Sequence, residues 1–170
     1  KRVSRLGGHF VGSLGAVHTS ADVEKVLLKA DFRYFLPIQT RWKDNDQYGH
    51  VNNAVYYDYF DSAINHWLIN RGGLEIGRDT RAVIVSSSCL FHSSIQYPAL
   101  IEAGIRVKKL GKSSLHWEIG IFPVSPKADP LQKPAAVGSM VHVFVSEAAG
   151  SRPVPIPKNI RDQIVAELLQ

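Results

Sequence analysis

The sequence predicts an α+β domain in which one curved antiparallel sheet wraps around a single long helix. Three observations support this fold: a strand pattern comes first, one stretch with helical spacing follows it, and four runs of alternating apolar and polar residues come last. The 170 residues suffice for one core and are few for two. We expect the domain at 32–147, an N-terminal extension with a short helix at 1–31, and a C-terminal extended segment and helix at 148–170.

The N-terminal extension is predicted to start as an arm and to end in a helix. Residues 1–18 contain three basic residues and no acid. Thr19 and Asp22 form a capping pattern before apolar residues at helical spacing, which are Val23, Val26, Leu27 and Ala30. A single cysteine, Cys89, fits a reducing compartment, so we expect a cytoplasmic protein. A mitochondrial location is the alternative, because a basic, acid-poor start is also typical of transit segments.

The next two elements are a strand and the long helix. Residues 32–42 alternate apolar and polar side chains, and Pro37 within them indicates a strand near a sheet edge. Residues 53–71 carry an apolar stripe with a period of 3.6 residues, which stops at Gly72 and Gly73. We therefore expect one long amphipathic helix directly after a turn-rich segment.

Four alternating runs follow, and in each we expect the odd-numbered positions to face the core. Their apolar residues are Val83, Val85, Cys89, Phe91 and Ile95; Ile101, Ala103, Ile105 and Val107; Leu115, Trp117, Ile119 and Ile121; and Val137, Val141, Val143 and Val145. A short connection near Pro98 predicts that the first run pairs with the second. A short connection at 110–112 predicts that the second run pairs with the third. A final amphipathic helix is predicted around Ile160, Ile164, Val165 and Leu168.

The informative segment is Arg41–Tyr56, between the first strand and the long helix. Two carboxylates, Asp44 and Asp46, precede Gly49, which permits a sharp turn, and Asn53 is well placed as the helix N-cap. The first N–H groups of a helix have no internal partner and polarise a nearby carbonyl. A carboxylate beside such donors is what thioester hydrolysis requires. The alternative for an Asp-rich turn is a helix cap and a solvated loop.

The same segment resembles a known family. Asp44-x-Asp46-x-x-Gly49-His50-Val-Asn-Asn53-x-x-Tyr56, followed by Tyr-Phe-Asp in the helix, is similar to the 4-hydroxybenzoyl-CoA thioesterase-like branch of the hotdog superfamily. The resemblance covers about residues 33–147 and implies a hotdog fold: a five-stranded antiparallel sheet around one long helix. It also implies an acyl-CoA thioesterase, which releases free acid and coenzyme A.

The resemblance implies a role for individual residues. Asp46 takes the place of the catalytic carboxylate, as nucleophile or general base, and the backbone N–H of Asn53 that of the donor to the thioester carbonyl. His50 would orient Asp46 or the substrate, with a structural role as an equal alternative. The expected substrate-binding residues are Gly49, Tyr56, Lys109, Lys112 and Ser113, the last three at a hairpin that is otherwise a solvated tip.

Composition narrows the partners. A net charge of +5 favours an anionic partner such as coenzyme A, whereas the scattered Lys and Arg, without any nucleic-acid-binding motif, argue against nucleic acid. No apolar stretch approaches the roughly 20 residues that cross a bilayer. His92, His116 and His142 lie at even-numbered strand positions without a close-spaced pair, so we expect no metal and no cofactor.

Two further expectations concern assembly and alternatives. Exposed sheet edges favour association, and hotdog proteins are typically dimers or tetramers, so the resemblance implies a homodimer or homotetramer whose partner completes the acyl pocket. Two other functions stay open: a catalytically silent acyl-CoA-binding hotdog protein, and a dehydratase of hydroxyacyl thioesters that uses His50 with Asp46.

Overall fold

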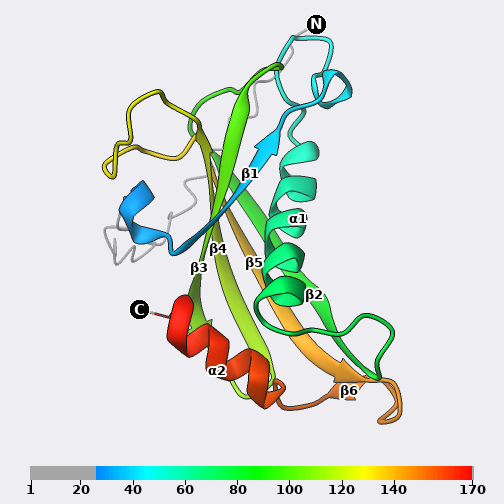
Figure 1. Cartoon of the computed structure of the whole chain (residues 1–170). Helices are drawn as coiled ribbons and strands as arrows, with labels where there is room; N and C mark the ends of the chain where they lie inside the picture. Colours follow the sequence, from blue (N-terminus) through cyan, green and yellow to red (C-terminus); the bar gives the residue numbers. More distant parts are fainter. Residues whose placement is uncertain (1–25, 170) are drawn as a thin grey trace, which may run out of the picture.

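The computed structural model describes residues 26–169, in which a strongly curved antiparallel sheet wraps around one helix (Figure 1). The elements are β1 (Tyr34–Gln39), α1 (Val55–Asn70), β2 (Thr80–Phe91), β3 (Leu100–Leu110), β4 (Ser114–Pro123), β5 (Ala136–Ser146), β6 (Arg152–Pro153) and α2 (Lys158–Glu167). Five long strands follow the order β1-β3-β4-β5-β2, and the two-residue β6 pairs with β5. The predicted α+β hotdog architecture is confirmed.

The core lies between α1 and the concave face of the sheet. One stripe of α1 is buried, made up of Tyr56, Tyr59, Phe60, Ala63, Ile64, Trp67 and Leu68. Phe60 lies so close to β5 that a Cβ added to Gly138 would stand 2.5 Å from its ring. Each large apolar side chain buried in this way contributes roughly 1.5–3 kcal/mol. The 3.6-residue stripe therefore fixes α1 against the sheet, with its N-terminal end beside the loop that follows β1.

The predicted pairing of the first two alternating runs is wrong. β2 pairs with β5, while β3 pairs with β1 and β4. Residues 92–99 carry the chain from the edge strand β2 across to β3, which lies between β1 and β4, instead of turning back. They are held on the way by a hydrogen bond from Val51 N–H to Ile95 O (2.8 Å) and by one from Tyr97 N–H to Asn45 Oδ1 (3.1 Å). This crossing segment also packs beneath the loop that precedes α1.

The predicted core face is wrong for β5 and for the first half of β2. In β5 the even-numbered side chains Met140, His142 and Phe144 are buried, and the odd-numbered valines before Val145 lie on the outer face. In β2 an irregularity between Ile84 and Ser86 shifts the alternation by one residue. Because side chains alternate with a period of two, one inserted residue exchanges the two faces.

The two helices predicted near the ends of the chain have different outcomes. The helix predicted around Thr19 falls mainly outside the described residues, and its last part is a 3-10 turn at Lys29–Asp31 that follows a non-helical stretch. The C-terminal helix is confirmed as α2. Its Glu167 accepts hydrogen bonds from Trp67 Nε1 (3.1 Å) and Arg71 Nη2 (2.7 Å), which ties α2 to the end of α1. Within residues 26–169, no helix is long and apolar enough to cross a membrane.

Candidate active site

The loop between β1 and α1 closes on itself as a small hairpin at one end of the sheet (Figure 1). Asn45 and Val51 form an isolated antiparallel bridge across its base. Between them, Asp46 N–H donates to His50 O (2.8 Å), and Gly49 N–H donates to Asp46 O (3.1 Å). Gly49 has a φ of +80°, a left-handed conformation that favours glycine. The sharp turn predicted at this glycine is present.

Asp46 lies at the start of this turn with one oxygen held and one available. Tyr48 N–H donates to Asp46 Oδ1 at 2.8 Å, the Asx-turn that an aspartate forms with the second following residue. No residue within 26–169 donates a hydrogen bond to Oδ2. The side chain is half-buried, so this second oxygen of a fixed carboxylate is open to a reactant. Sequence reasoning missed Tyr48, because a backbone donor leaves no trace in residue type.

The same loop offers a backbone donor just before the start of α1. The N-cap predicted at Asn53 is corrected to Ala54, because α1 begins at Val55. Asn52 Oδ1 accepts from Ala54 N–H (2.9 Å), and the Asn52 carbonyl accepts from Val55 N–H (2.9 Å). Asn53 is exposed, and its own N–H meets no acceptor among the described residues. A free N–H at a helix start carries the positive end of the helix dipole. Asparagine is a preferred cap residue and alanine is not, so the sequence pointed to Asn53 instead of Ala54.

Asp44 has a different environment from Asp46, because it is buried and fully engaged. Its carboxylate accepts from Arg41 N–H (2.8 Å), Arg41 Nε (2.9 Å) and the Tyr59 hydroxyl (2.8 Å). Burial raises the pKa of Asp44, but the hydrogen bonds and the charge of Arg41 outweigh it and hold the pKa below its usual value. Burial and the bond to Asp44 raise the pKa of Tyr59. Asp44 thus anchors the loop to α1.

The other residues predicted in this segment differ in accessibility. The His50 ring is exposed and forms no hydrogen bond with any residue of 26–169, Asp46 included. Tyr56 is 2% exposed and packs edge-to-face on Phe91, with ring centroids 5.1 Å apart. Burial raises the pKa of the Tyr56 hydroxyl. In a single chain, therefore, the loop surface around Asp46 is open and the Tyr56 ring lies beneath it.

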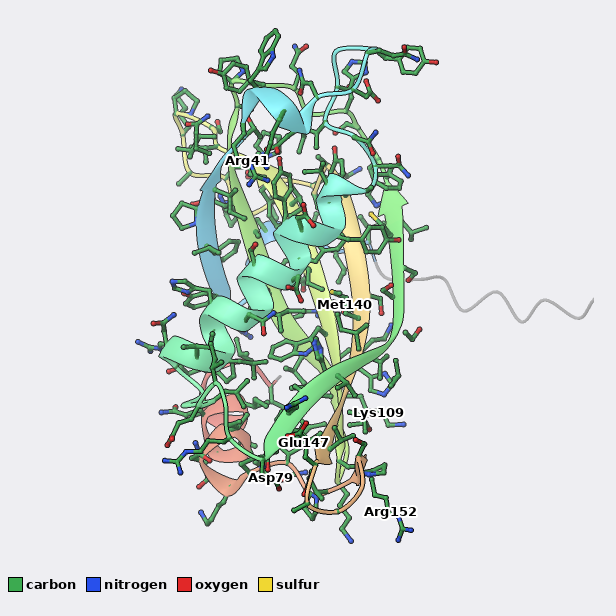
Figure 2. The ribbon with its side chains drawn as sticks, turned by 90° about the vertical axis from the view of Figure 1, so that its right-hand side faces the viewer. Arg41, Asp79, Lys109, Met140, Glu147 and Arg152 are labelled. Atoms are coloured by element: carbon green, nitrogen blue, oxygen red, sulfur yellow. The ribbon has the colours of Figure 1, made fainter. Side chains whose placement is uncertain are left out.

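The predicted lysines lie at the far end of the molecule. Lys109 and Lys112 are exposed and flank the β3–β4 hairpin, and Ser113, half-buried, accepts a hydrogen bond from Phe144 N–H through its carbonyl (2.8 Å). Figure 2 shows Lys109 and Arg41, which precedes the active-site loop, towards opposite ends of the sheet. One chain does not bring these lysines to Asp46.

The three strand histidines do not share a face. His142 is 2% exposed and lies in the core, where its ring centroid is 6.4 Å from that of Trp117, so its predicted outward position is corrected. His116 is half-buried on the outer face, and His92 is exposed beyond the end of β2. Within the described part of the chain, no three His, Cys, Asp or Glu side chains gather closely enough to hold a metal ion.

Known proteins share both the sequence of this region and the fold. A model of the thioesterase superfamily matches residues 48–127, from within the active-site loop to beyond β4. The crystal structure of the PA5185 protein from Pseudomonas aeruginosa strain PAO1 is 44% identical with a TM-score of 0.76, over 83% of this chain and 95% of that one. The chain belongs to the thioesterase superfamily.

Other members of the thioesterase superfamily extend the comparison. A thioesterase from Thermus thermophilus, solved in complex with coenzyme A and zinc, is 29% identical with a TM-score of 0.64, over 80% of this chain and 95% of that one. The uncharacterized protein YsmA of Bacillus subtilis strain 168 is 22% identical over 72% of this chain and 79% of its own length. Thioester hydrolysis is accordingly the general reaction of this chain.

Proposed function

We propose that the chain hydrolyses acyl-coenzyme A thioesters with Asp46 as the catalytic carboxylate. The observation that carries the proposal is that one loop holds both Asp46 Oδ2 and the Asn53 N–H, and neither group has a hydrogen-bond partner within residues 26–169. A fixed N–H donor polarises the thioester carbonyl and stabilises the negative charge that develops on its oxygen. The thioesterase from Thermus thermophilus that was solved with bound coenzyme A supports coenzyme A as the thiol of the substrate.

Two routes use the same groups and the same stoichiometry. In the first, an Asp46 oxygen bonds to the acyl carbon, the C–S bond breaks, and coenzyme A leaves as a thiolate. Water then hydrolyses the resulting anhydride and restores the carboxylate. In the second, Asp46 takes a proton from water as the water oxygen attacks the acyl carbon, and that proton passes to the departing thiolate. Each route consumes one water and yields one acid and one thiol.

The neighbouring residues fit supporting roles in this proposal. Gly49 has no side chain to obstruct an acyl group approaching Asp46, and nothing would lie within 4 Å of a Cβ at that position. His50, exposed in the same turn, is available to contact the thioester or the pantetheine arm. Tyr56, whose ring packs edge-to-face with Phe91, would form part of the floor of the acyl pocket.

We propose that a second copy of the chain completes the site along β2. This strand ends the sheet, pairs only with β5, and carries one charged residue, Arg81, in twelve. Apolar side chains are exposed along it, namely Val83, Ile84, Val85, Leu90 and Phe91. A long, largely apolar edge strand readily pairs with another strand. Antiparallel pairing of β2 with its copy relates the two subunits by a two-fold axis normal to the sheet. One end of the sheet in the first subunit then lies beside the opposite end of the sheet in the second.

This geometry accounts for the distance between the two groups of predicted residues. The partner's β3–β4 hairpin would lie at the level of Asp46, so the lysines at 109 and 112 would reach a ligand bound across both subunits. Two ammonium groups there suit the phosphates of coenzyme A, and Ser113 adds a polar contact. The proposed assembly is a homodimer, and two such dimers would form a homotetramer.

The proposal is tested by thiol release from short, long and aromatic acyl-CoA esters, with oxygen esters of the same acids as controls. We expect hydrolysis of at least one CoA ester and no comparable hydrolysis of the oxygen esters. Binding of the CoA esters without thiol release would instead identify a catalytically silent acyl-CoA-binding protein. Loss of water from 3-hydroxyacyl-CoA, without thiol release, would identify a dehydratase.

A further inference from the structure

A separate cavity of about 580 Å³ lies on the face of the sheet that points away from α1. Its floor includes Arg106, Glu118 and Val137, which alternate with the core-facing residues of β3, β4 and β5. Leu90 pairs with Val137 and extends the floor to β2. None of the residues proposed for catalysis lines it. The volume is within the range of roughly 300–1,000 Å³ that small-molecule sites occupy.

Positive charge predominates among the described residues of this cavity. Glu118, 7% exposed, accepts from Arg106 Nε (2.7 Å) and forms an ion pair with Lys108 Nζ (3.0 Å). Its single negative charge therefore faces two positive charges. Lys133 and His92 also line the cavity, and neither forms an ion pair with a residue of 26–169. An anionic group is therefore favoured beside Lys133, where no carboxylate of the described chain competes for it.

The remaining lining is aliphatic. Val26, Leu27, Leu90, Pro134 and Val137 supply this apolar surface, and no Phe, Tyr or Trp ring contributes among the described residues. Val26 is 64% exposed and Leu90 is 56% exposed, an arrangement that leaves apolar surface available to a ligand. A nucleotide base would find only the small His92 imidazole on which to stack, whereas a flexible hydrocarbon chain would bury this aliphatic surface along its length.

We propose that this cavity binds a monocarboxylate with a hydrocarbon chain, with the carboxylate at Lys133 and His92 and the chain along Val26, Leu90 and Val137. Such an acid belongs to the same chemical class as the acid that acyl thioester hydrolysis releases. The inference rests on the cavity alone, however, and holds whether or not Asp46 is catalytic.

The test is calorimetric titration of the full chain with decanoate, below its micellar range. Lys133→Glu should weaken decanoate binding at least about tenfold, which corresponds to 1.4 kcal/mol. The matched control is Lys127→Glu, on the same loop but outside the cavity, which should bind like the parent. Val26→Glu should also weaken binding, whereas Val124→Glu, also exposed but not in the lining, should not.

Uncharged decanol and short acetate separate the two halves of the proposed site. Decanol should bind more weakly than decanoate because it lacks the charge, and acetate should not compete because it lacks the chain. Absence of saturable decanoate binding would overturn the proposal, as would equal affinity in the parent and the two cavity variants. Thiol release by the same preparations reports separately on the active site, so either proposal is able to fail alone.

Discussion

Tyr48 donates its backbone N–H to Asp46 Oδ1 at 2.8 Å and so fixes the orientation of the carboxylate that we propose as catalytic. Asp46 Oδ2 then has no hydrogen-bond donor in the described chain. The backbone of the turn, and not another side chain, sets the orientation of this carboxylate. A carboxylate held in this way needs little rearrangement before it attacks or accepts a proton. The arrangement also explains why Gly49 lies three residues on, since its positive φ closes the turn.

Removal of the Asn53 N–H tests the proposed carbonyl donor. Asn53→Pro deletes this N–H at the start of a helix, where proline is tolerated, and should lower kcat about 100-fold or more. Asn53→Ala keeps the N–H and should retain nearly the parent kcat for thiol release. Equal activity in the two variants would exclude this N–H from catalysis, and circular dichroism checks that both variants fold.

The Asp44 anchor predicts a measurable loss of stability. Tyr59→Phe removes the hydroxyl that donates to the buried carboxylate at 2.8 Å, so the free energy of unfolding in urea should fall by about 2 kcal/mol. Tyr57→Phe is the matched control, because the Tyr57 hydroxyl has no hydrogen-bond partner in residues 26–169 and its ring packs on Phe60. If Tyr57→Phe lowers the free energy of unfolding as much as Tyr59→Phe does, the loss is not specific to the hydrogen bond between Tyr59 and Asp44.

The pH dependence of that loss follows from the lowered pKa of Asp44. A carboxyl whose folded pKa lies below the usual value of about 3.9 stabilises the fold above that value. This contribution disappears as the pH falls through the folded pKa. The difference between parent and Tyr59→Phe should therefore be full at neutral pH and shrink in acid.

The sequence predicts the helix and the middle of the sheet well but not every face. The stripe from Tyr56 to Leu68, and the alternation of β3 and β4, each have one clearly apolar side, and both were correct. β5 has apolar residues on both faces, because Val137 lines the outer cavity while Met140 and Phe144 fill the core. Periodicity does not choose between two apolar faces.

The site was predicted to a similar extent. The turn at Gly49 follows from local sequence, whereas the first residue of α1 depends on backbone angles that the preferred cap residue Asn53 did not reveal. The separation of Lys109 from Asp46 is a property of the tertiary fold, because sequence motifs carry no information on which end of a sheet each loop occupies.

His142 predicts a second dependence on pH. Burial lowers the pKa of this histidine, and Asp61 opposes the shift only in part. Its neutral form stabilises the fold above the usual pKa of about 6.5, and that contribution is lost as the pH falls from there through the folded pKa. The unfolding free energy of His142→Gln should fall less steeply between pH 7 and 5, by up to about 1.4 kcal/mol per pH unit. Equal slopes in the parent and in His142→Gln would contradict this dependence.

The exposed β2 edge predicts the oligomeric state. Val85→Lys places a charge on a side chain that is 60% exposed, in the proposed dimer contact, and should shift the protein to monomer in analytical ultracentrifugation. Leu131→Lys, 68% exposed in the β4–β5 loop, should leave the assembly unchanged. If both variants sediment like the parent, the subunits do not associate through β2.

The most direct measurement is kcat for thiol release from the best acyl-CoA ester, compared between the parent, Asp46→Asn and Asp129→Asn. Asp129, in the loop between β4 and β5, forms the same kind of turn: its Oδ1 accepts from Leu131 N–H (2.9 Å). Asp129 is not among the residues proposed for the site, so Asp129→Asn controls for the loss of a charge in such a turn. We predict that Asp46→Asn binds the ester, unfolds at the parent urea concentration and loses at least about 100-fold in kcat, while Asp129→Asn matches the parent. Parent-like kcat in Asp46→Asn would contradict the account.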